Sequence, residues 1–173
     1  MTTSTAYCES VPASVLHAEI SKLGVQHLLI VPDTHQKTLL KSLKDDSAFK
    51  MHTFSTEDEA ICVNSGLWMG GAEALVIIQN VGLFASMNSL RGVAMDMHVP
   101  TCLLVGQYGR NVNVPTEEDP SSGCRLVQGM LESVGVPCYV IDREDDVGVL
   151  SKAFAQSREE RGPVVVLISA PTK

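Results

Sequence analysis

Short apolar runs alternate along the chain with longer stretches that have helical periodicity. Most of the apolar runs are rich in β-branched residues and bounded by turn-forming residues, which is typical of buried strands. They predict strands over 27–31, 51–54, 74–79, 101–106, 138–141 and 163–169. The stretches between them predict helices over 36–44, 57–69, 84–97, 125–134 and 145–161.

Strands that alternate with helices of this length form βαβ units, and such units build a parallel sheet. Because the strands are apolar throughout and not only at every second position, we expect helices to cover both faces of the sheet. The chain has 173 residues, a length that fits one domain. The sequence therefore predicts an α/β fold: a single three-layer domain, 1–173, with a mostly parallel sheet of about six strands.

The predicted helix after residue 56 begins with three acids in succession, Glu57, Asp58 and Glu59. Thr56 followed by Glu59 three residues later indicates a capping box, and Gly70 is expected to end the helix. Acids at a helix start also interact favourably with the helix dipole. Since Asp58 and Glu59 serve that purpose by themselves, Glu57 is either a further solvated acid or a carboxylate aimed into a pocket.

Ligands of parallel α/β sheets bind beyond the carboxyl ends of the strands. This rule selects the segments 31–35, 54–57, 79–84 and 106–125. The last of these is long for a connection in a compact domain, and loops of that length are often lids or binding loops. It could equally be a mobile connection.

Three polar residues, Asp33, Thr34 and His35, follow the first predicted strand. Asp33 or Thr34 could cap the next helix, which would be a structural role. His35 could instead donate a proton or contact an anion. Both interpretations stay open on the residues alone.

Two amides and a glycine, Gln79, Asn80 and Gly82, end the strongest predicted strand. The glycine permits a tight turn or the close approach of a ligand. An ordinary strand-to-helix turn with Asn80 as N-cap is the alternative. The segment lacks the GxxxxGK[ST] pattern of a phosphate-binding loop, and no GxGxxG follows the first strand.

Composition and charge exclude several classes of function. The net charge is −7, and no cluster of Lys and Arg offers a nucleic-acid-binding surface. No apolar run approaches the roughly 20 residues of a membrane span. Residues 1–10 lack the basic and apolar regions of a signal peptide, and the five histidines show no metal-ligand spacing. We therefore expect a cytoplasmic protein without a metal site of its own.

The five cysteines are odd in number, and none forms a CxxC pair. A disulfide framework or a zinc site is therefore not expected, and a reducing compartment fits. Cys62 and Cys102 lie in apolar runs and are expected to be inert core thiols. Cys124, beside Arg125 in a predicted loop, is the one expected to be more reactive.

Several segments together resemble the pyrimidine-binding domain of thiamine-diphosphate enzymes. They are PDTHQKTLLKSL, TEDEAICVNSG, VIIQNVGLFASMNSL, MHVPTCLLVGQYG and GVPCYVID, and the resemblance extends from about Val15 to Ile168. It is strongest to the α subunit of two-subunit sulfopyruvate decarboxylase, followed by phosphonopyruvate decarboxylase. In that family a glutamate lies nine residues before a glycine, as Glu57 lies before Gly66 here. The family pattern Q-N-S-G-L-G-N-S-x-N corresponds to residues 79–88.

The resemblance implies a role for Glu57. The family's glutamate forms a hydrogen bond with N1′ of the cofactor's aminopyrimidine and thereby promotes proton transfer within the cofactor. Glu57 is accordingly the predicted catalytic residue. The predicted cofactor-binding residues are Glu57, Gln79, Asn80, Gly82 and Asn88.

The chain lacks the GDG…N motif through which thiamine-diphosphate enzymes bind Mg²⁺ and the diphosphate. The resemblance implies that a separate β subunit carries the diphosphate-binding domain. The active sites would lie between the two chains, in an α2β2 or larger assembly. Mg²⁺ would be bound through the partner. Leu83, Phe84, Met87, Met95 and Met97 are candidate apolar contacts for that partner, and a plain core role is their alternative.

The implied substrate is a 2-oxo acid with an anionic tail, 3-sulfopyruvate or 3-phosphonopyruvate, which needs cationic or donor-rich contacts. The candidates are Asp33, Thr34, His35, Arg110 and Asn111, with Asn113 nearby.

Two other functions remain open. One is half of a related carboligase or transketolase-like enzyme with the same cofactor. The other is a non-catalytic module that binds a partner. Phe84, which replaces the family's second glycine and is followed by Ala85 in place of asparagine, and the lack of a diphosphate-binding motif motivate the module.

Overall fold

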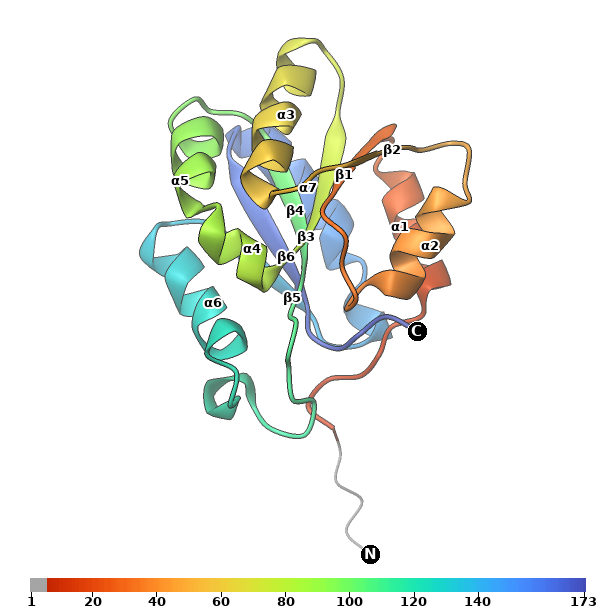
Figure 1. Cartoon of the computed structure of the whole chain (residues 1–173), viewed down its shortest axis with the longest axis vertical. Coiled ribbons are helices and arrows are strands. Elements are labelled where there is room, and N and C mark those ends of the chain that lie inside the picture. Colours follow the sequence, from red (N-terminus) through yellow and green to blue (C-terminus); the bar gives the residue numbers. More distant parts are fainter. Residues whose placement is uncertain (1–5) are drawn as a thin grey trace, which may run out of the picture.

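The computed structural model describes residues 6–173. Its centre is one sheet of six strands in the order β2-β1-β3-β4-β6-β5 (Figure 1). Every neighbouring pair of strands is parallel. The strands are β1 (His27–Ile30), β2 (Lys50–Thr53), β3 (Ala74–Gln79), β4 (Thr101–Gly106), β5 (Cys138–Ile141) and β6 (Pro163–Ile168).

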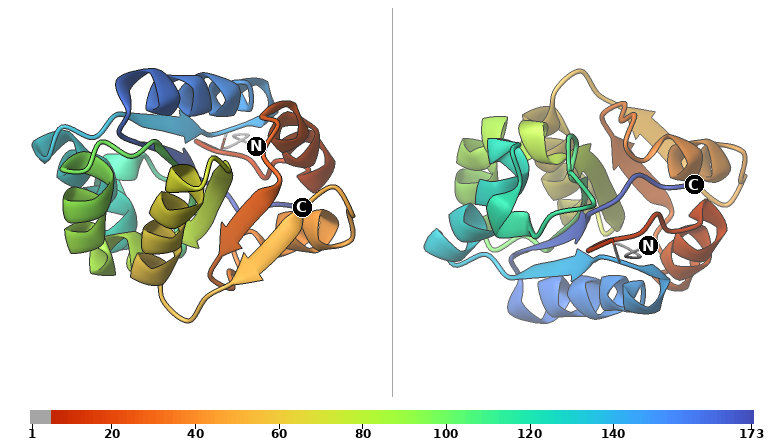
Figure 2. Two further views of the ribbon diagram at one scale, coloured as in Figure 1. Left: turned by 90° about the horizontal axis from the view of Figure 1, so that it is seen from above. Right: turned by 90° about the horizontal axis from the view of Figure 1, so that it is seen from below.

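Helices cover both faces of the sheet (Figure 2). One face carries α1 (Ala13–Lys22), α2 (Lys37–Lys44) and α7 (Val149–Glu160). The other carries α3 (Glu57–Met69), α4 (Asn80–Ala85), α5 (Met87–Ser89), the π-helix η1 (Leu90–Met95) and α6 (Ser122–Ser133). Two short 3-10 helices complete the chain, η2 (Thr116–Glu118) and η3 (Glu144–Asp146). The predicted fold class is confirmed.

The hydrophobic core has two halves, one on each face of the sheet. In β3, Leu75 and Ile77 pack with the helices of one face, while Val76 and Ile78 pack with those of the other. Successive strand residues point to opposite faces, so a strand covered on both sides must be apolar at every position. This explains the unbroken apolar runs in the sequence.

The predicted strands agree with the observed ones to within one residue at each end. The helices differ more. The helix predicted over 84–97 begins earlier, at Asn80, and is interrupted at Ser86 before η1 ends it at Met95. Helix α1 was not predicted at all, although Leu16 and Ile20, one turn apart, are both fully buried.

The predicted capping box at α3 is wrong in its details. Thr56 is the N-cap residue, but its side chain forms no capping hydrogen bond. The Glu59 carboxylate reaches one residue further back and accepts a hydrogen bond from the Ser55 amide at 3.2 Å. The end of the helix is as predicted, with Gly70 as C-cap followed by Gly71 at a φ of +79°.

The predictions for the cysteines need correction. Cys62 is exposed on α3, because it lies on the helix face turned away from the sheet. Cys124 is buried in α6, and burial raises the pKa of its thiol. Cys102 is buried as predicted, and burial raises its pKa to about 12.

Two expectations concern the chain as a whole. Within 6–173 no helix is long and apolar enough to cross a membrane. Half of the segment judged not to be a signal peptide, residues 1–5, lies outside the described residues.

Candidate functional site

The carboxyl ends of β1 and β3 mark the point where the chain reverses its direction across the sheet. From β1 the chain passes to β2 on one side and then to β3 on the other. Connections that diverge in this way leave a crevice between them, which is where parallel sheets bind ligands. Asp33 follows β1, Glu57 opens the helix after β2, and Gln79 ends β3. The fold therefore brings three of the predicted site residues to one place.

Glu57 lies directly over Gly82. A methyl group at Gly82 would be only 1.8 Å from the Glu57 Cδ and 1.9 Å from its Oε1, so no larger residue fits there without displacing the carboxylate. The Glu57 side chain is half-buried, whereas Asp58 and Glu59 are exposed. Among the described residues, the Glu57 carboxylate has no hydrogen-bond or ion-pair partner. Of the two interpretations of Glu57, the contact with Gly82 and the partial burial favour a carboxylate turned inward toward α4 over a further solvated acid.

Asp33 is the polar centre of the crevice. Its buried carboxylate accepts hydrogen bonds from the His35 amide at 2.7 Å, from Gln36 Nε2 at 2.9 Å and from Gln79 Nε2 at 2.6 Å. These three hydrogen bonds offset the free energy that burial of a charged carboxylate would otherwise cost. The bond to Gln79 orients its half-buried amide and leaves Gln79 Oε1 available to a ligand.

The crevice needs a glycine at the end of β4 as well. A methyl group at Gly106 would lie 2.7 Å from Asp33 Oδ2 and 3.0 Å from the His35 ring. Gln36 Nε2, which also donates to the Ile78 carbonyl at 3.0 Å, would be 3.2 Å away. Neither Gly106 nor Gln36 was predicted. The position of Gln36 three residues after Asp33 at a helix start was the available signal.

His35 is buried, and its Nε2 lies 3.0 Å from the Ile168 carbonyl. Since a carbonyl can only accept, Nε2 carries the proton. Burial lowers the pKa of His35, although the nearby Asp33 carboxylate acts in the opposite direction. The histidine is therefore neutral at pH 7. Its hydrogen bond connects the segment after β1 with the end of β6.

Asn80 is fully buried, and its side chain forms polar contacts with three segments of the chain. Its Oδ1 accepts from the Val81 amide at 3.0 Å and from the Tyr108 amide at 3.1 Å. Its Nδ2 lies 3.6 Å from Cys124 Sγ on α6. The predicted N-cap role is wrong, because Gln79 is the N-cap residue of α4. The predicted cofactor role of Asn80 stays a prediction.

The remaining predicted site residues lie apart from this network. Asn88 is exposed and accepts a hydrogen bond from Arg91 Nη2 at 3.0 Å. Thr34 is exposed beside the buried Asp33. Their roles stay predictions.

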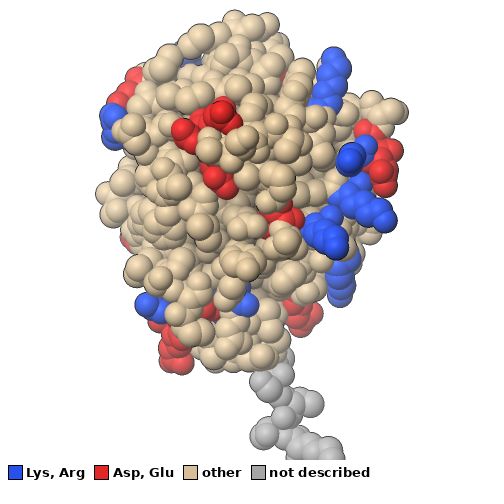
Figure 3. Space-filling view, in the orientation of Figure 1, with Lys and Arg blue, Asp and Glu red and all other residues tan. Residues whose placement is uncertain are grey.

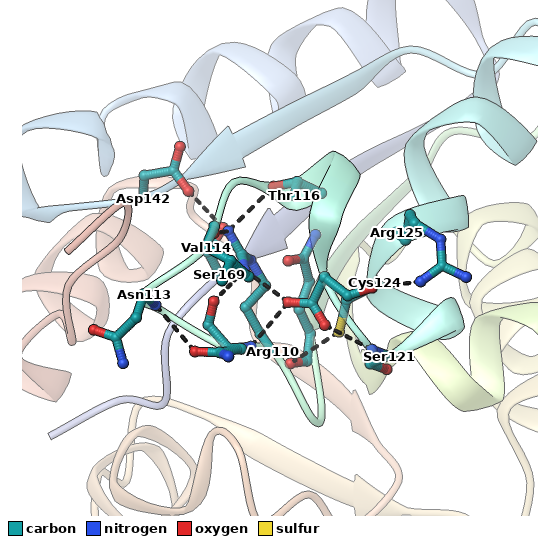
Figure 4. Close-up of polar contacts among 12 residues, drawn as sticks. Arg110, Asn113, Val114, Thr116, Ser121, Cys124, Arg125, Asp142 and Ser169 are labelled. Carbon is teal, nitrogen blue, oxygen red and sulfur yellow. Dashed lines mark hydrogen bonds and ion pairs between the residues drawn. The ribbon is translucent and has the colours of Figure 1, made fainter.

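Arg110 is the centre of the long loop between β4 and α6 (Figure 4). Its Nη1 pairs with the buried Asp119 carboxylate at 2.7 Å, and its Nη2 donates to the Val114 carbonyl at 2.8 Å. The same carboxylate accepts from the amides of Asn111 at 2.9 Å and Ser121 at 2.8 Å. The loop is thus ordered around a buried ion pair, and Arg110 contributes to its structure. Asp119, which completes the pair, was not singled out in the sequence.

The sequence is similar to proteins of known activity. No model of a known protein family matches the chain. The α subunit of sulfopyruvate decarboxylase from Methanococcus maripaludis is 24% identical over 159 residues, which are 91% of this chain and 94% of that subunit. The phosphonopyruvate decarboxylase of Streptomyces viridochromogenes is 31% identical over 107 residues, 62% of this chain and 26% of that protein. The resemblance predicted from the sequence is confirmed.

The fold is shared with a putative thiamin diphosphate-dependent enzyme from Mycobacterium smegmatis. The TM-score is 0.68 at 22% identity, over 95% of this chain and 32% of that one. The present chain therefore shares the fold of about a third of that longer chain, and its similarity to the Methanococcus maripaludis α subunit covers most of that subunit.

Proposed function

We propose that this chain is the pyrimidine-binding α subunit of a thiamine-diphosphate-dependent 2-oxo acid decarboxylase. The observation that carries the proposal is the position of Glu57. Its carboxylate is half-buried, lacks a partner among the described residues and lies against Gly82 beside the switch point of the sheet. The similarity to α subunits along nearly the whole chain supports the same conclusion.

The residues present fit an aminopyrimidine. Such a ring offers a basic nitrogen and an amino group in one plane, so it needs a carboxyl group that can share a proton with the nitrogen and has no competing partner. Glu57 is such a group, and Gly82 leaves room for its carboxylate. Gln79 Oε1, held by the bond from Nε2 to Asp33, provides a further acceptor within the crevice.

The chemistry divides between cofactor and protein. A bound thiamine diphosphate would supply the nucleophile for the ketone of a 2-oxo acid and the electron sink for the loss of CO₂. Glu57 would hold a proton at the ring nitrogen, and its partial burial strengthens that hydrogen bond. Asp33 would fix the Gln79 amide so that it need not reorganise during the reaction.

The proposed partner is a β subunit with the diphosphate-binding domain, which would hold Mg²⁺ and complete the site in an α2β2 or larger assembly. The naming of the relatives as alpha subunits supports this division. The proposed substrate is 3-sulfopyruvate or 3-phosphonopyruvate, and the proposed location is the cytoplasm. Among the substrate candidates, Thr34 and Asn111 have side chains outside the buried hydrogen-bond networks.

Phe84 motivated the non-catalytic alternative. In the structure its ring packs against the core cluster under α3, α4 and α6. Because that ring contributes to the core, Phe84 has a structural role and does not indicate that the site has been lost. This packing supports the enzyme over the non-catalytic module.

The first experiment is purification of the chain with whatever binds it in its native cells, followed by mass spectrometry. We expect a stoichiometric partner with a GDG…N motif, and the complex should release CO₂ and an aldehyde from 3-sulfopyruvate or 3-phosphonopyruvate. A new carbon–carbon bond in the product would instead indicate a carboligase.

In that complex, Glu57→Gln should lower turnover at least about 100-fold while the assembly and its melting temperature stay unchanged. Asp58→Asn is the matched control, since Asp58 is an exposed acid in the same turn and its loss should change turnover less than about twofold. Retained turnover in Glu57→Gln, or a chain that purifies alone with thiamine diphosphate and Mg²⁺ added, would contradict the proposal.

A further inference from the structure

A groove of about 560 Å³ lies between α2 and the edge strand β2, and it extends to Ile30 and Asp33 at the end of β1. Its floor is mostly apolar, with Leu40 from the helix and Phe49 and Met51 from the segment that forms the edge strand. Its rim carries three exposed lysines, Lys37, Lys41 and Lys44.

The lysines form a row. Their spacing of four and then three residues places all three on one face of α2, across about 10 Å of helix. Figure 3 shows Lys and Arg side chains gathered over α2, in a chain whose net charge is −7, so the expectation that Lys and Arg form no cluster was wrong for this helix. Among the described residues, no ion pair involves any of these three lysines. The row is therefore a cationic surface without internal compensation.

The edge strand beside this row has unpaired backbone groups. Alternate residues of β2 bond to β1: the Lys50 amide donates to the Gln26 carbonyl at 2.7 Å and the Phe54 amide to the Ile30 carbonyl at 2.9 Å. The intervening residues, Met51 and Thr53, must point their N–H and C=O groups away from β1. Within residues 6–173 these groups have no backbone partner, and their side chains line the groove.

We propose that this groove binds an extended acidic segment of another protein, which adds to the sheet as a seventh strand beside β2. Met51 and Thr53 would supply up to four backbone hydrogen bonds. The acids of the segment, at the alternate positions that point to the α2 side of the sheet, would face the lysine row, and the side chains between them would lie on the opposite face. Strand addition to an exposed edge is a common mode of peptide recognition.

Charge decides between possible occupants. Pairing of the β2 edges of two copies would bring Lys50 and the lysine row of each copy to one junction, and such like charges oppose edge-to-edge association. An acidic segment gains from the same charges. The occupant is therefore a different chain with Asp or Glu at alternate positions.

The probe for the test is an eight-residue peptide of alternating Glu and Val, capped at both ends and labelled with a fluorophore. We expect saturable binding to the full chain, measured by fluorescence anisotropy, and none for the same peptide with Lys in place of Glu. Hydrogen exchange at the amides of Met51 and Thr53 should slow at least about tenfold in the complex. Absence of binding would overturn the proposal.

Two variants separate the charge from the backbone contribution. Lys37→Glu with Lys41→Glu should weaken binding at least about tenfold, whereas the matched reversal of the exposed Lys152 and Lys173 should not. Thr53→Pro removes one edge N–H without touching the pairing with β1, so it should weaken binding while the circular dichroism spectrum is preserved.

Equal effects of the two charge reversals would overturn the proposed lysine row. Unchanged binding by Thr53→Pro would overturn strand addition. Displacement of the peptide by millimolar ATP, but not by the same concentration of sulfate, would identify the groove as a site for small amphipathic anions and would also overturn it.

Discussion

At the scale of single residues, the close contact between Glu57 and Gly82 distinguishes this crevice from an ordinary strand-to-helix turn. The two positions are far apart in the sequence, and each depends on the other. A side chain at 82 would occupy the volume of the carboxylate, and a shorter acid at 57 would not reach the glycine.

Gly82→Ala tests this contact. The added methyl group would displace the Glu57 carboxylate, so turnover of the assembled enzyme should fall by at least about tenfold. Because the carboxylate is the end of a flexible, half-buried side chain, the free energy of unfolding should change by less than about 1 kcal/mol. The control is Gly129→Ala, an exposed position on α6 where a methyl group meets nothing within 4 Å. That change should stabilise the helix by about 0.5–1 kcal/mol and leave turnover unaltered.

Activity kinetics and urea denaturation of both variants check the expectation. Equal turnover in the two variants would show that the carboxylate need not lie where the structure places it.

At the scale of elements, the long loop after β4 owes its order to a buried ion pair between Arg110 and Asp119. Burial by itself would raise the pKa of Asp119. Hydrogen bonds from the Asn111 and Ser121 amides and the contact with Arg110 outweigh it and lower the pKa below its usual range. A carboxyl group with a lowered pKa stabilises the fold in its charged form.

The stability that Asp119 contributes is therefore complete above its unfolded pKa and is lost as the pH falls through the lower pKa of the folded state. Asp119→Asn would leave the buried Arg110 without a counter-charge and should cost about 3–5 kcal/mol at neutral pH. The difference in melting temperature between this variant and the original chain should shrink on acidification. Asp96→Asn removes half of an exposed pair and should cost less than about 0.5 kcal/mol. A difference that grows at low pH would contradict the assignment.

At the scale of the whole molecule, burial divides the five cysteines. Cys8, Cys102 and Cys124 are buried, Cys138 is partly buried, and only Cys62 is exposed. Burial raises the pKa of Cys102 and of Cys138 to about 12, so neither forms a thiolate near neutral pH.

An aromatic disulfide reagent should therefore modify about one thiol per native chain quickly, and all of them after denaturation. Cys62→Ser should abolish the fast phase, and Cys124→Ser, the control, should leave it intact. Mass spectrometry of peptides identifies the modified site. A fast phase that survives Cys62→Ser would mean that the native chain opens more readily than its packing indicates.

The sequence by itself determined the strands and the class of the fold, because a strand buried on both faces needs apolar residues throughout and such runs are visible in one dimension. It also singled out Glu57 as the candidate catalytic residue, since the helix start had two other acids for the dipole and the surrounding motifs resemble a known family; that role stays a prediction. The apolar residues of α1 also have helical spacing, so this helix could have been predicted from the sequence, but it was missed.

Only the tertiary structure decided which polar residues meet. The bond from Gln79 to Asp33 and the close approach of Gly106 join residues at the ends of β1, β3 and β4, so no local pattern indicates them. It also decided that Cys62 faces solvent, that Cys124 does not, and that Arg110 lies in the middle of its loop. Hydrophobic periodicity records which face of an element is buried, whereas a site depends on the order in which the strands are laid side by side.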